Sequence, residues 1–182
     1  MIITITGKPC SGKGSVSKHF CNRYNFKYIC TGDMFREFSQ KRGVDILNLQ
    51  LSDDVKEIDK LVDDKIIEIG KSQSKENIVI DSRLAWHFIP NSFKVFIDVD
   101  WDTASNRLMN ANRENEKATS ISQAEKILKK RWQVENDRYL ELYGVNNLNL
   151  ENYDLIISSN NKSIEEISKE IYKNYQKFMQ KA

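Results

Sequence analysis

The most informative part of the chain for its fold is the stretch Gly7-Lys8-Pro9-Cys10-Ser11-Gly12-Lys13-Gly14-Ser15. It follows a short run of β-type residues, Ile2 to Thr6, and precedes a segment with helical spacing. A Gly-x4-Gly-Lys motif between a strand and a helix lets successive backbone N–H groups turn inward around phosphate oxygens, and the helix adds its N-terminal dipole. The stretch therefore predicts an ATP-type phosphate-binding loop, in which Lys13 bridges the β- and γ-phosphates.

Two positions in this loop have more than one interpretation. Gly14 stands where many such loops have Ser or Thr, so Ser15 is the candidate Mg²⁺ ligand, directly or through water. A thiol among so many N–H donors can be reactive, but Cys10 is also a small residue that fits the loop. We favour the structural role for Cys10.

The composition is that of one folded domain over residues 1–182, with 40% hydrophobic and 30% charged residues. Lys+Arg 28 against Asp+Glu 26 leaves a net charge of +2, which gives no general electrostatic case for nucleic-acid binding. The sequence has no apolar run of membrane-spanning length, and its three cysteines lack CxxC spacing. We expect a cytoplasmic monomer with neither a nucleic-acid nor a membrane partner.

Short β-type runs alternate with segments of helical spacing along the chain. The expected strands are Ile2–Thr6, Lys27–Cys30, Asn77–Asp81, Lys94–Val99 and Tyr153–Ser158. The expected helices are 13–24, 33–42, 53–69, 103–112, 122–143 and 163–179. Near-continuous apolar strands joined by helices predict a three-layer α/β/α fold with a five-stranded parallel sheet.

Phosphoryl transfer needs positive groups on the acceptor phosphate and on the migrating phosphoryl group, so arginines are the informative residues. Thr31-Gly32-Asp33-Met34-Phe35-Arg36 follows the second strand at the carboxyl edge of the sheet, where such folds bind ligands. Either Thr31 or Asp33 is the candidate helix cap. From these residues alone, a capped helix with a solvated Arg36 is favoured over a binding role.

Asp81-Ser82-Arg83 ends the third strand. An acid at a strand end opposite a phosphate loop typically orients Mg²⁺ or its waters, so Asp81 joins Ser15 as a candidate Mg²⁺ residue. Arg83 lies two residues further, within reach of an acceptor phosphate. A surface turn is the weaker alternative.

Two further groups of charges carry weaker signals. Arg131, Glu135 and Arg138 recur at i, i+4 and i+7 and so share one helix face, and from these residues alone a solvated charged stripe is favoured. Arg107 and Arg113 bracket the entrance to the aperiodic polar stretch 113–120. This stretch is either a solvated connector or a mobile flap, and the two arginines either close over a nucleotide or are ordinary helix-end charges.

Taken in order and spacing, these motifs resemble nucleoside monophosphate kinases, most closely the compact archaeal-type cytidylate kinase family. The resemblance spreads over most of the chain. It rests on the phosphate loop, Thr31 to Arg36, Asn77 to Ala85, Arg131-x3-Glu135-x2-Arg138-Tyr139, Leu142-Tyr143-Gly144 and Tyr153 to Ile157.

The resemblance implies a P-loop NTPase fold with an acceptor-binding helical arm at about 31–70 and a short lid at about 113–122. It implies ATP-dependent conversion of CMP, and of dCMP, to the diphosphate with Mg²⁺. The implied ATP-binding residues are Gly7, Lys8, Pro9, Cys10, Ser11, Gly12, Lys13, Gly14, Ser15, Arg107 and Arg113. The implied acceptor-binding residues are Thr31, Phe35, Arg36, Arg83, Glu135 and Arg138, with Phe35 at the base and Glu135 near the sugar. The implied catalytic residues are Lys13, Asp81, Arg83 and Arg131, the last stabilising the migrating phosphoryl group, and Ser15 and Asp81 hold Mg²⁺.

Departures from the family pattern bear on the acceptor. Trp86 stands where the family usually has a small residue, so its indole either reshapes the acceptor pocket or packs under it. Asp81 and Ser82 replace the more usual Glu-Gly or Asp-Gly pair. The alternatives are a P-loop kinase for AMP, UMP, shikimate or dephospho-coenzyme A, and a nucleotide-sensing protein without transferase activity.

Overall fold

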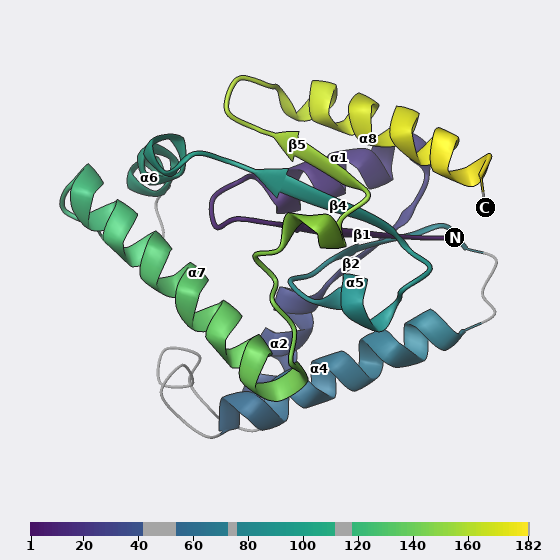
Figure 1. Cartoon of the computed structure of the whole chain (residues 1–182), viewed down its shortest axis with the longest axis horizontal. Helices are drawn as coiled ribbons and strands as arrows, with labels where there is room; N and C mark the ends of the chain where they lie inside the picture. The colour runs from purple at the N-terminus through teal and green to yellow at the C-terminus, as the bar shows by residue number, and fades with distance from the viewer. Residues whose placement is uncertain (42–53, 73–75, 112–117, 182) are drawn as a thin grey trace.

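The computed structural model describes residues 1–41, 54–72, 76–111 and 118–181. Its strands are β1 (Ile2–Gly7), β2 (Lys27–Cys30), β3 (Ile78–Asp81), β4 (Phe93–Asp98) and β5 (Leu155–Ser158). They form one five-stranded sheet in the order β2-β3-β1-β4-β5, and every pairing is parallel. Because β1 is central, the loop that leaves its carboxyl end lies between the ends of β3 and β4 (Figure 1).

Helices cover both faces of the sheet (Figure 1). They are α1 (Lys13–Tyr24), α2 (Thr31–Lys41), α4 (Asp54–Lys71), α5 (Ala85–Phe88), α6 (Trp101–Asn110), α7 (Ile121–Tyr143) and α8 (Ile164–Met179), with a short 3₁₀ turn at Leu150–Asn152. Residues of α1 and α8 pack on one face, whereas α4, α5 and α7 cover the other. The three-layer α/β/α architecture predicted from the sequence is confirmed.

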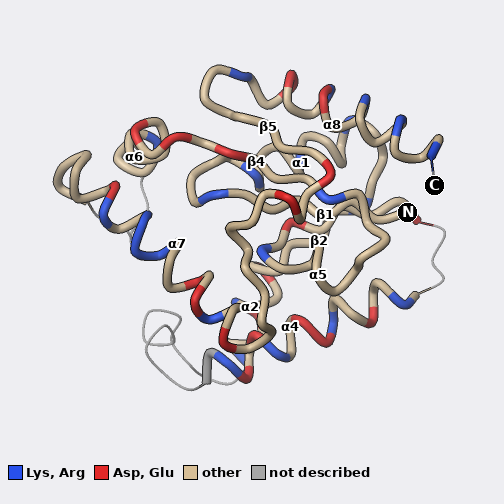
Figure 2. Tube along the Cα trace, viewed as in Figure 1, with Lys and Arg blue, Asp and Glu red and all other residues tan. Residues whose placement is uncertain are grey.

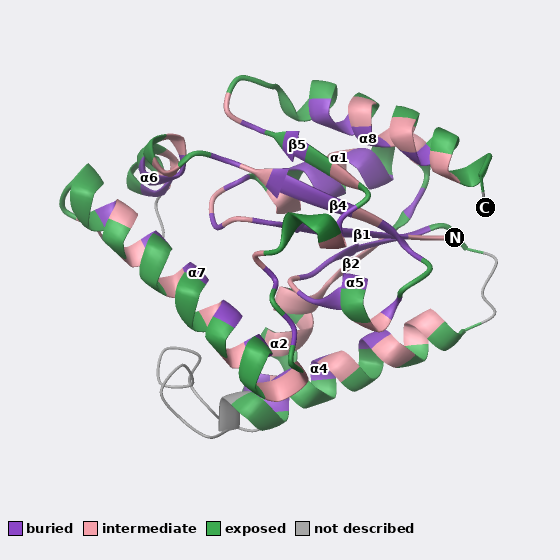
Figure 3. Cartoon of the chain, viewed as in Figure 1, coloured by how far each residue is buried: buried purple, intermediate pink, exposed green. Residues whose placement is uncertain are grey.

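The strands contribute alternate residues to two cores. Ile3 and Ile5 of β1 pack with Phe20 of α1, whereas Ile80 of β3 packs with Ile66 of α4 on the opposite face. All five side chains are at most 1% exposed, and the three central strands β3, β1 and β4 are mostly buried (Figure 3). Burial on both faces explains why the strands read as apolar runs rather than as an alternating pattern.

Element boundaries differ from expectation in a few places. The four-residue helix α5 was not predicted, because so short a helix has no measurable periodicity. Helix α2 begins at Thr31, so both candidate caps, Thr31 and Asp33, lie inside its first turn. Helix α7 ends as expected at Tyr143, and the Gly144 that follows has a φ of 66°, the left-handed conformation that favours glycine. Among the helices described, none is long and apolar enough to cross a membrane.

Candidate active site

The loop between β1 and α1 has the backbone of a phosphate cradle. Gly12, directly before α1, has φ +83°, and Cys10 also has a positive φ of 59°. The hydroxyl oxygen of Ser11 is buried and has no hydrogen-bond partner among the described residues. Left-handed residues in such a loop turn N–H groups to one side, and the start of α1 adds unpaired donors. The loop therefore offers donors to an anion at the carboxyl edge of the sheet.

Asp81 lies opposite this loop, as its position at the end of β3 predicts. The ammonium of Lys13 is paired with Asp81 Oδ1, and the Tyr28 hydroxyl donates to Oδ2 at 3.2 Å. Burial and the Asp81 charge raise the pKa of Tyr28, which keeps its proton for this bond. Thr31 Oγ1 donates to the Asp81 carbonyl at 3.3 Å, so the start of α2 is fixed to the same strand end. Sequence reasoning did not single out Tyr28.

Arg83 connects the phosphate loop to α7. Its Nη1 donates to the Gly7 carbonyl, and its Nε lies 2.8 Å from Glu135 Oε2. The other oxygen of Glu135 accepts from Arg131 Nε at 3.1 Å. Burial disfavours the charged form of Glu135, but the charges of Arg83 and then Arg131 outweigh it and hold the pKa of Glu135 below its usual range. The Glu135 carboxylate thus contacts both Arg83, which follows β3, and Arg131, which lies on α7.

Arg138 lies on the same face of α7 but pairs with a different acid. Its Nε is 2.9 Å from Oδ2 of Asp59 on α4, and its guanidinium lies over the Tyr139 ring. One turn along α4, Asp63 accepts a hydrogen bond from the Tyr143 hydroxyl. Burial raises the pKa of Asp59 to about 6 and that of Asp63 to about 7. Acids and bases alternate along both helices (Figure 2), and for α7 the sequence alone favoured a solvated charged stripe.

Two acceptor candidates stand apart from this cluster. Arg36 is exposed and pairs with Asp33, three residues earlier on the same helix. Phe35 is half-buried. The structure therefore brings Arg83, Arg131 and Arg138 together with Glu135, but it shows Arg36 as a solvated helix arginine.

Arg107 contacts the phosphate loop from α6. Its Nη1 donates to the Cys10 carbonyl at 3.2 Å, and its Nη2 donates to the Ser159 carbonyl, just after β5, at 2.7 Å. It is therefore not a free helix-end charge. The other candidate of this pair, Arg113, and positions 113–117 of the expected lid lie outside the described residues.

Lys8 ties the start of the phosphate loop to the end of β4. Its ammonium lies 2.7 Å from Asp98 Oδ1, donates to the Val99 carbonyl at 3.2 Å, and sits over the Trp101 ring. These contacts turn the Lys8 side chain toward the end of β4 and the start of α6, whereas the Lys13 side chain lies at Asp81, at the end of β3. The two lysines of the loop thus have different neighbours.

Trp86, on α5, packs in a core cluster with Phe96 of β4 and Trp132 of α7 and is 8% exposed. Its Nε1 donates to Asn147 Oδ1 at 2.8 Å, and Tyr153 donates to the same oxygen at 2.8 Å. The Asn147 N–H in turn donates to Asn136 of α7 at 2.9 Å. Of the two interpretations left open for this indole, the structure favours packing, with a buried amide network that fixes the residues after β3 to α7.

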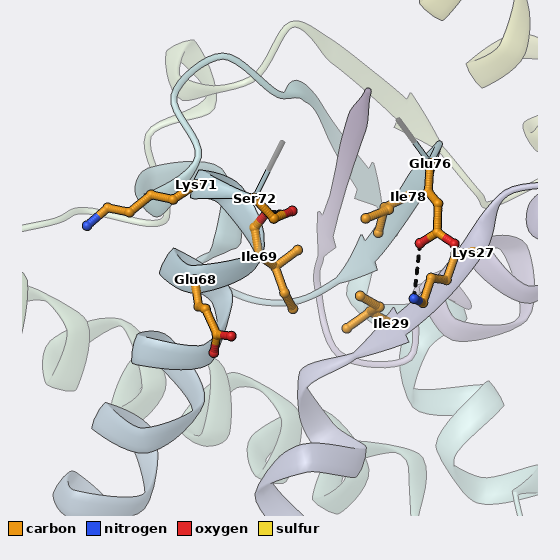
Figure 4. A pocket seen from close by; sticks show the side chains of 8 residues that line it. All are labelled: Lys27, Ile29, Glu68, Ile69, Lys71, Ser72, Glu76 and Ile78. Atoms are coloured by element: carbon orange, nitrogen blue, oxygen red, sulfur yellow. Dashed lines mark hydrogen bonds and ion pairs between the residues drawn. The ribbon is translucent and has the colours of Figure 1, made fainter. Parts of the chain in front are cut away.

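A separate hollow of about 540 Å³ lies between the end of α4 and the first residues of β2 and β3 (Figure 4). Ile29, Ile69 and Ile78 form its floor, and Lys27 pairs with Glu76 at its rim. It is at the amino-terminal edge of these strands, opposite the phosphate loop. It contributes nothing to the arginine cluster.

The fold and the phosphate-binding loop define an α/β protein of the P-loop class. An uncharacterized protein from Eubacterium ventriosum has a similar structure, with a TM-score of 0.72 at 21% identity over 96% of this chain and 97% of that one. Shikimate kinase from Aquifex aeolicus gives a TM-score of 0.61 at 16% identity, covering 97% and 96% of the two chains. At these identities the similarity concerns the fold.

The chain belongs to the cytidylate kinase-like family, whose profile matches residues 2–161. A cytidylate kinase from Sulfurisphaera tokodaii is 32% identical over 96% of both chains, and one from Saccharolobus islandicus is 33% identical over 93% of this chain and 87% of that one. A S-adenosylmethionine-dependent nucleotide dehydratase from Lacinutrix mariniflava is 35% identical over 96% of this chain. The chain spans only 36% of the dehydratase's length. The family profile and the relatives named cytidylate kinase support a kinase.

Proposed function

We propose that this protein transfers the γ-phosphoryl group of ATP to CMP or dCMP. The observation that supports this most directly is the position of Arg83. It contacts the carbonyl of Gly7 in the phosphate loop and shares the Glu135 carboxylate with Arg131. A donor phosphate in the loop and an acceptor phosphate on the arginines would therefore be neighbours, as in-line transfer requires.

The proposed donor site is the loop from Gly7 to Ser15, with Arg107 and Arg113 completing it. Lys13 exchanges its contact with Asp81 for the β- and γ-phosphates when ATP binds. Arg131 and Lys13 neutralise the charge of the migrating phosphoryl group. Catalysis by positioning and electrostatics needs no covalent intermediate.

The donors at this edge fit Mg²⁺. The residues described contain no group of three or more acidic, His or Cys side chains that could bind a metal ion without further ligands. Mg²⁺ in kinases takes phosphate oxygens and waters with only one or two protein ligands. We propose that the Ser15 hydroxyl and the Asp81 carboxylate would hold the ion, directly or through water, and that the bound ion would supply positive charge to the phosphates.

The proposed acceptor site is formed by Arg36, Arg83 and Arg138 on the phosphate, with Thr31, Phe35 and Glu135 toward the nucleoside. Arg36 must release Asp33 to join the others. Within one domain, residues of about 31–70 form the acceptor arm and about 113–122 the lid. We further propose that the protein works as a monomer in the cytoplasm.

An acceptor panel tests this function. ATP-dependent diphosphate formation is measured by coupled assay with CMP, dCMP, UMP, AMP, shikimate and dephospho-coenzyme A. We expect CMP or dCMP to give the highest kcat/KM. Preference for another acceptor would replace the proposed substrate, and tight ATP binding without transfer to any acceptor would favour a nucleotide-sensing role.

The similarity to a nucleotide dehydratase supports a second candidate acceptor. The part of that relative that is similar to this chain is about a third of its length, so a chain similar to this one is joined to further sequence in a protein named as a nucleotide dehydratase. A nucleoside monophosphate that has lost water is therefore added to the panel. A kcat/KM for the dehydrated acceptor above that for CMP would favour this candidate.

A further inference from the structure

Asp59 lies outside every motif that the sequence singled out, and it faces the acceptor arginines. It is on α4, is only 9% exposed, and its Oδ2 lies 2.9 Å from Arg138 Nε on α7. Helix α4 belongs to the proposed acceptor arm, whereas α7 carries the arginine cluster. This ion pair therefore joins the arm to a residue proposed to bind the acceptor phosphate.

The side of the guanidinium that Asp59 contacts matters for phosphate binding. A guanidinium presents its donors in a planar fork, and a phosphate accepts from two of its nitrogens at once. Asp59 contacts Arg138 at Nε, the nitrogen nearest the side-chain stem. The same arrangement recurs at Arg83 and Arg131, whose Nε atoms lie 2.8 and 3.1 Å from Glu135. In each case a carboxylate lies beside the stem side of the fork as an ion pair, and at Arg131 it also accepts the Nε–H hydrogen bond.

The electrostatics of the pair also favour an ordered Arg138. Burial alone would disfavour the charged guanidinium, but the Asp59 carboxylate outweighs it and raises the pKa of Arg138. The side chain of Arg138 is 22% exposed and that of Asp59 is 12% exposed, so solvent screens their attraction weakly. Loss of the Asp59 charge would leave Arg138 free to turn toward other carboxylates such as Glu135.

We propose that Asp59 is a positioning residue for the acceptor phosphate: it holds Arg138 by Nε so that the terminal nitrogens face the acceptor. This inference rests on the proposed function. It also makes alignment of Arg138 depend on docking of α4 against α7. Asp63 and Tyr143 join the same two helices one turn away, and their bond does not involve Arg138. Asp63→Asn is therefore a matched control for general weakening of the α4–α7 contact.

A double-mutant cycle of Asp59→Asn and Arg138→Lys tests the inference by steady-state kinetics with CMP or the preferred acceptor from the panel. We expect Asp59→Asn to raise the acceptor KM about 10-fold, the size of one lost charge-assisted contact. The KM for ATP and kcat should change less than about 2-fold, because ground-state acceptor binding is what the change removes. In the Arg138→Lys background, Asp59→Asn should add less than about 2-fold. Asp63→Asn should leave the acceptor KM unchanged.

Three outcomes overturn the inference. Multiplicative rises in KM in the double variant would mean that Asp59 acts independently of Arg138. An equal rise in Asp63→Asn would mean that the arm contact in general is responsible. If the wild type transfers phosphate to no monophosphate, the proposed function fails, and CMP binding by calorimetry then decides separately on Asp59. Equal CMP affinities of wild type and Asp59→Asn, or no CMP binding by the wild type, would reject it.

Discussion

Glu135 shares one carboxylate between Arg83 and Arg131, so neutralising it tests whether the cluster is held by charge. Glu135→Gln keeps the size of the side chain and removes its charge. Hydrogen bonds to charged groups contribute about 1.5–3 kcal/mol each, and exposed ion pairs about 0–1. The exposures of the Arg83, Glu135 and Arg131 side chains are 15%, 17% and 34%, which places these two contacts between those limits. We expect a loss of about 2 kcal/mol in the free energy of unfolding at pH 7.

The pH dependence of this loss gives it a distinctive sign. The pKa of Glu135 is lowered in the folded protein, since Arg83 and Arg131 outweigh the opposing effect of burial. A carboxyl group with a lowered pKa stabilises the folded state above its ordinary value of 4.5, and this contribution is lost as the pH falls through the folded-state pKa. The difference between wild type and Glu135→Gln should therefore shrink as the pH falls below about 4.5.

Urea unfolding at several pH values measures both effects. Glu125→Gln is the control, because Glu125 pairs with the half-exposed Lys129 on the same helix and should change stability by less than about 0.5 kcal/mol. A Glu135→Gln difference below about 0.5 kcal/mol at pH 7 would refute charge as the source of cluster stability. So would a difference that stays constant down to pH 3.5.

Three further predictions concern the loop, the transferring group and the buried network. Arg131→Ala should lower kcat by about 10³-fold or more if Arg131 neutralises the migrating phosphoryl group, and a near-normal kcat in steady-state assays would sink that role. Gly7→Ala would place a Cβ in overlap with the Ile97 carbonyl oxygen, so we expect a stability loss of about 1–3 kcal/mol and weaker ATP binding; an unchanged melting temperature and ATP affinity contradict this. Asn147→Ala leaves the buried Trp86 Nε1–H without its partner, so we expect the free energy of unfolding, measured in urea, to fall by about 1–3 kcal/mol. A fall of less than about 0.5 kcal/mol would show that water replaces Asn147 as the hydrogen-bond partner.

The sequence predicted the layers and the donor side of the site because both depend on local patterns. A strand buried on both faces is an apolar run, and a phosphate loop is a contiguous motif. Asp81 and Arg83 were predicted near the loop because the carboxyl ends of adjacent parallel strands meet at one edge. The structure brings Lys13 onto Asp81, and Arg83 onto the Gly7 carbonyl, at this edge.

The acceptor side was harder to predict because its partners are far apart in sequence. Asp59 and Asp63 stand four residues apart on α4, a spacing that a solvated face shares. Only packing of α4 on α7 shows that both acids face inward, toward Arg138 and Tyr143. The opposite holds for Arg36, which stays solvated beside Asp33. Long-range packing decides such cases, and a single helix pattern carries no information about it.

The pairing of cations with acids explains how so many positive charges can gather before any phosphate binds. Lys13 pairs with Asp81, Arg83 and Arg131 pair with Glu135, and Arg138 pairs with Asp59. Without these acids, mutual repulsion and burial would oppose the folded cluster.

The same pairs limit affinity, because an incoming phosphate must compete with a carboxylate for each cation it contacts. At Arg138, contact at Nε would reduce that competition, since the terminal nitrogens could take the phosphate while Asp59 stays in place. Lys13 has a single side-chain nitrogen, so a carboxylate and a phosphate cannot contact different nitrogens of this residue. We therefore expect binding of the donor phosphates to draw Lys13 from Asp81, whose carboxylate would then be available to hold Mg²⁺.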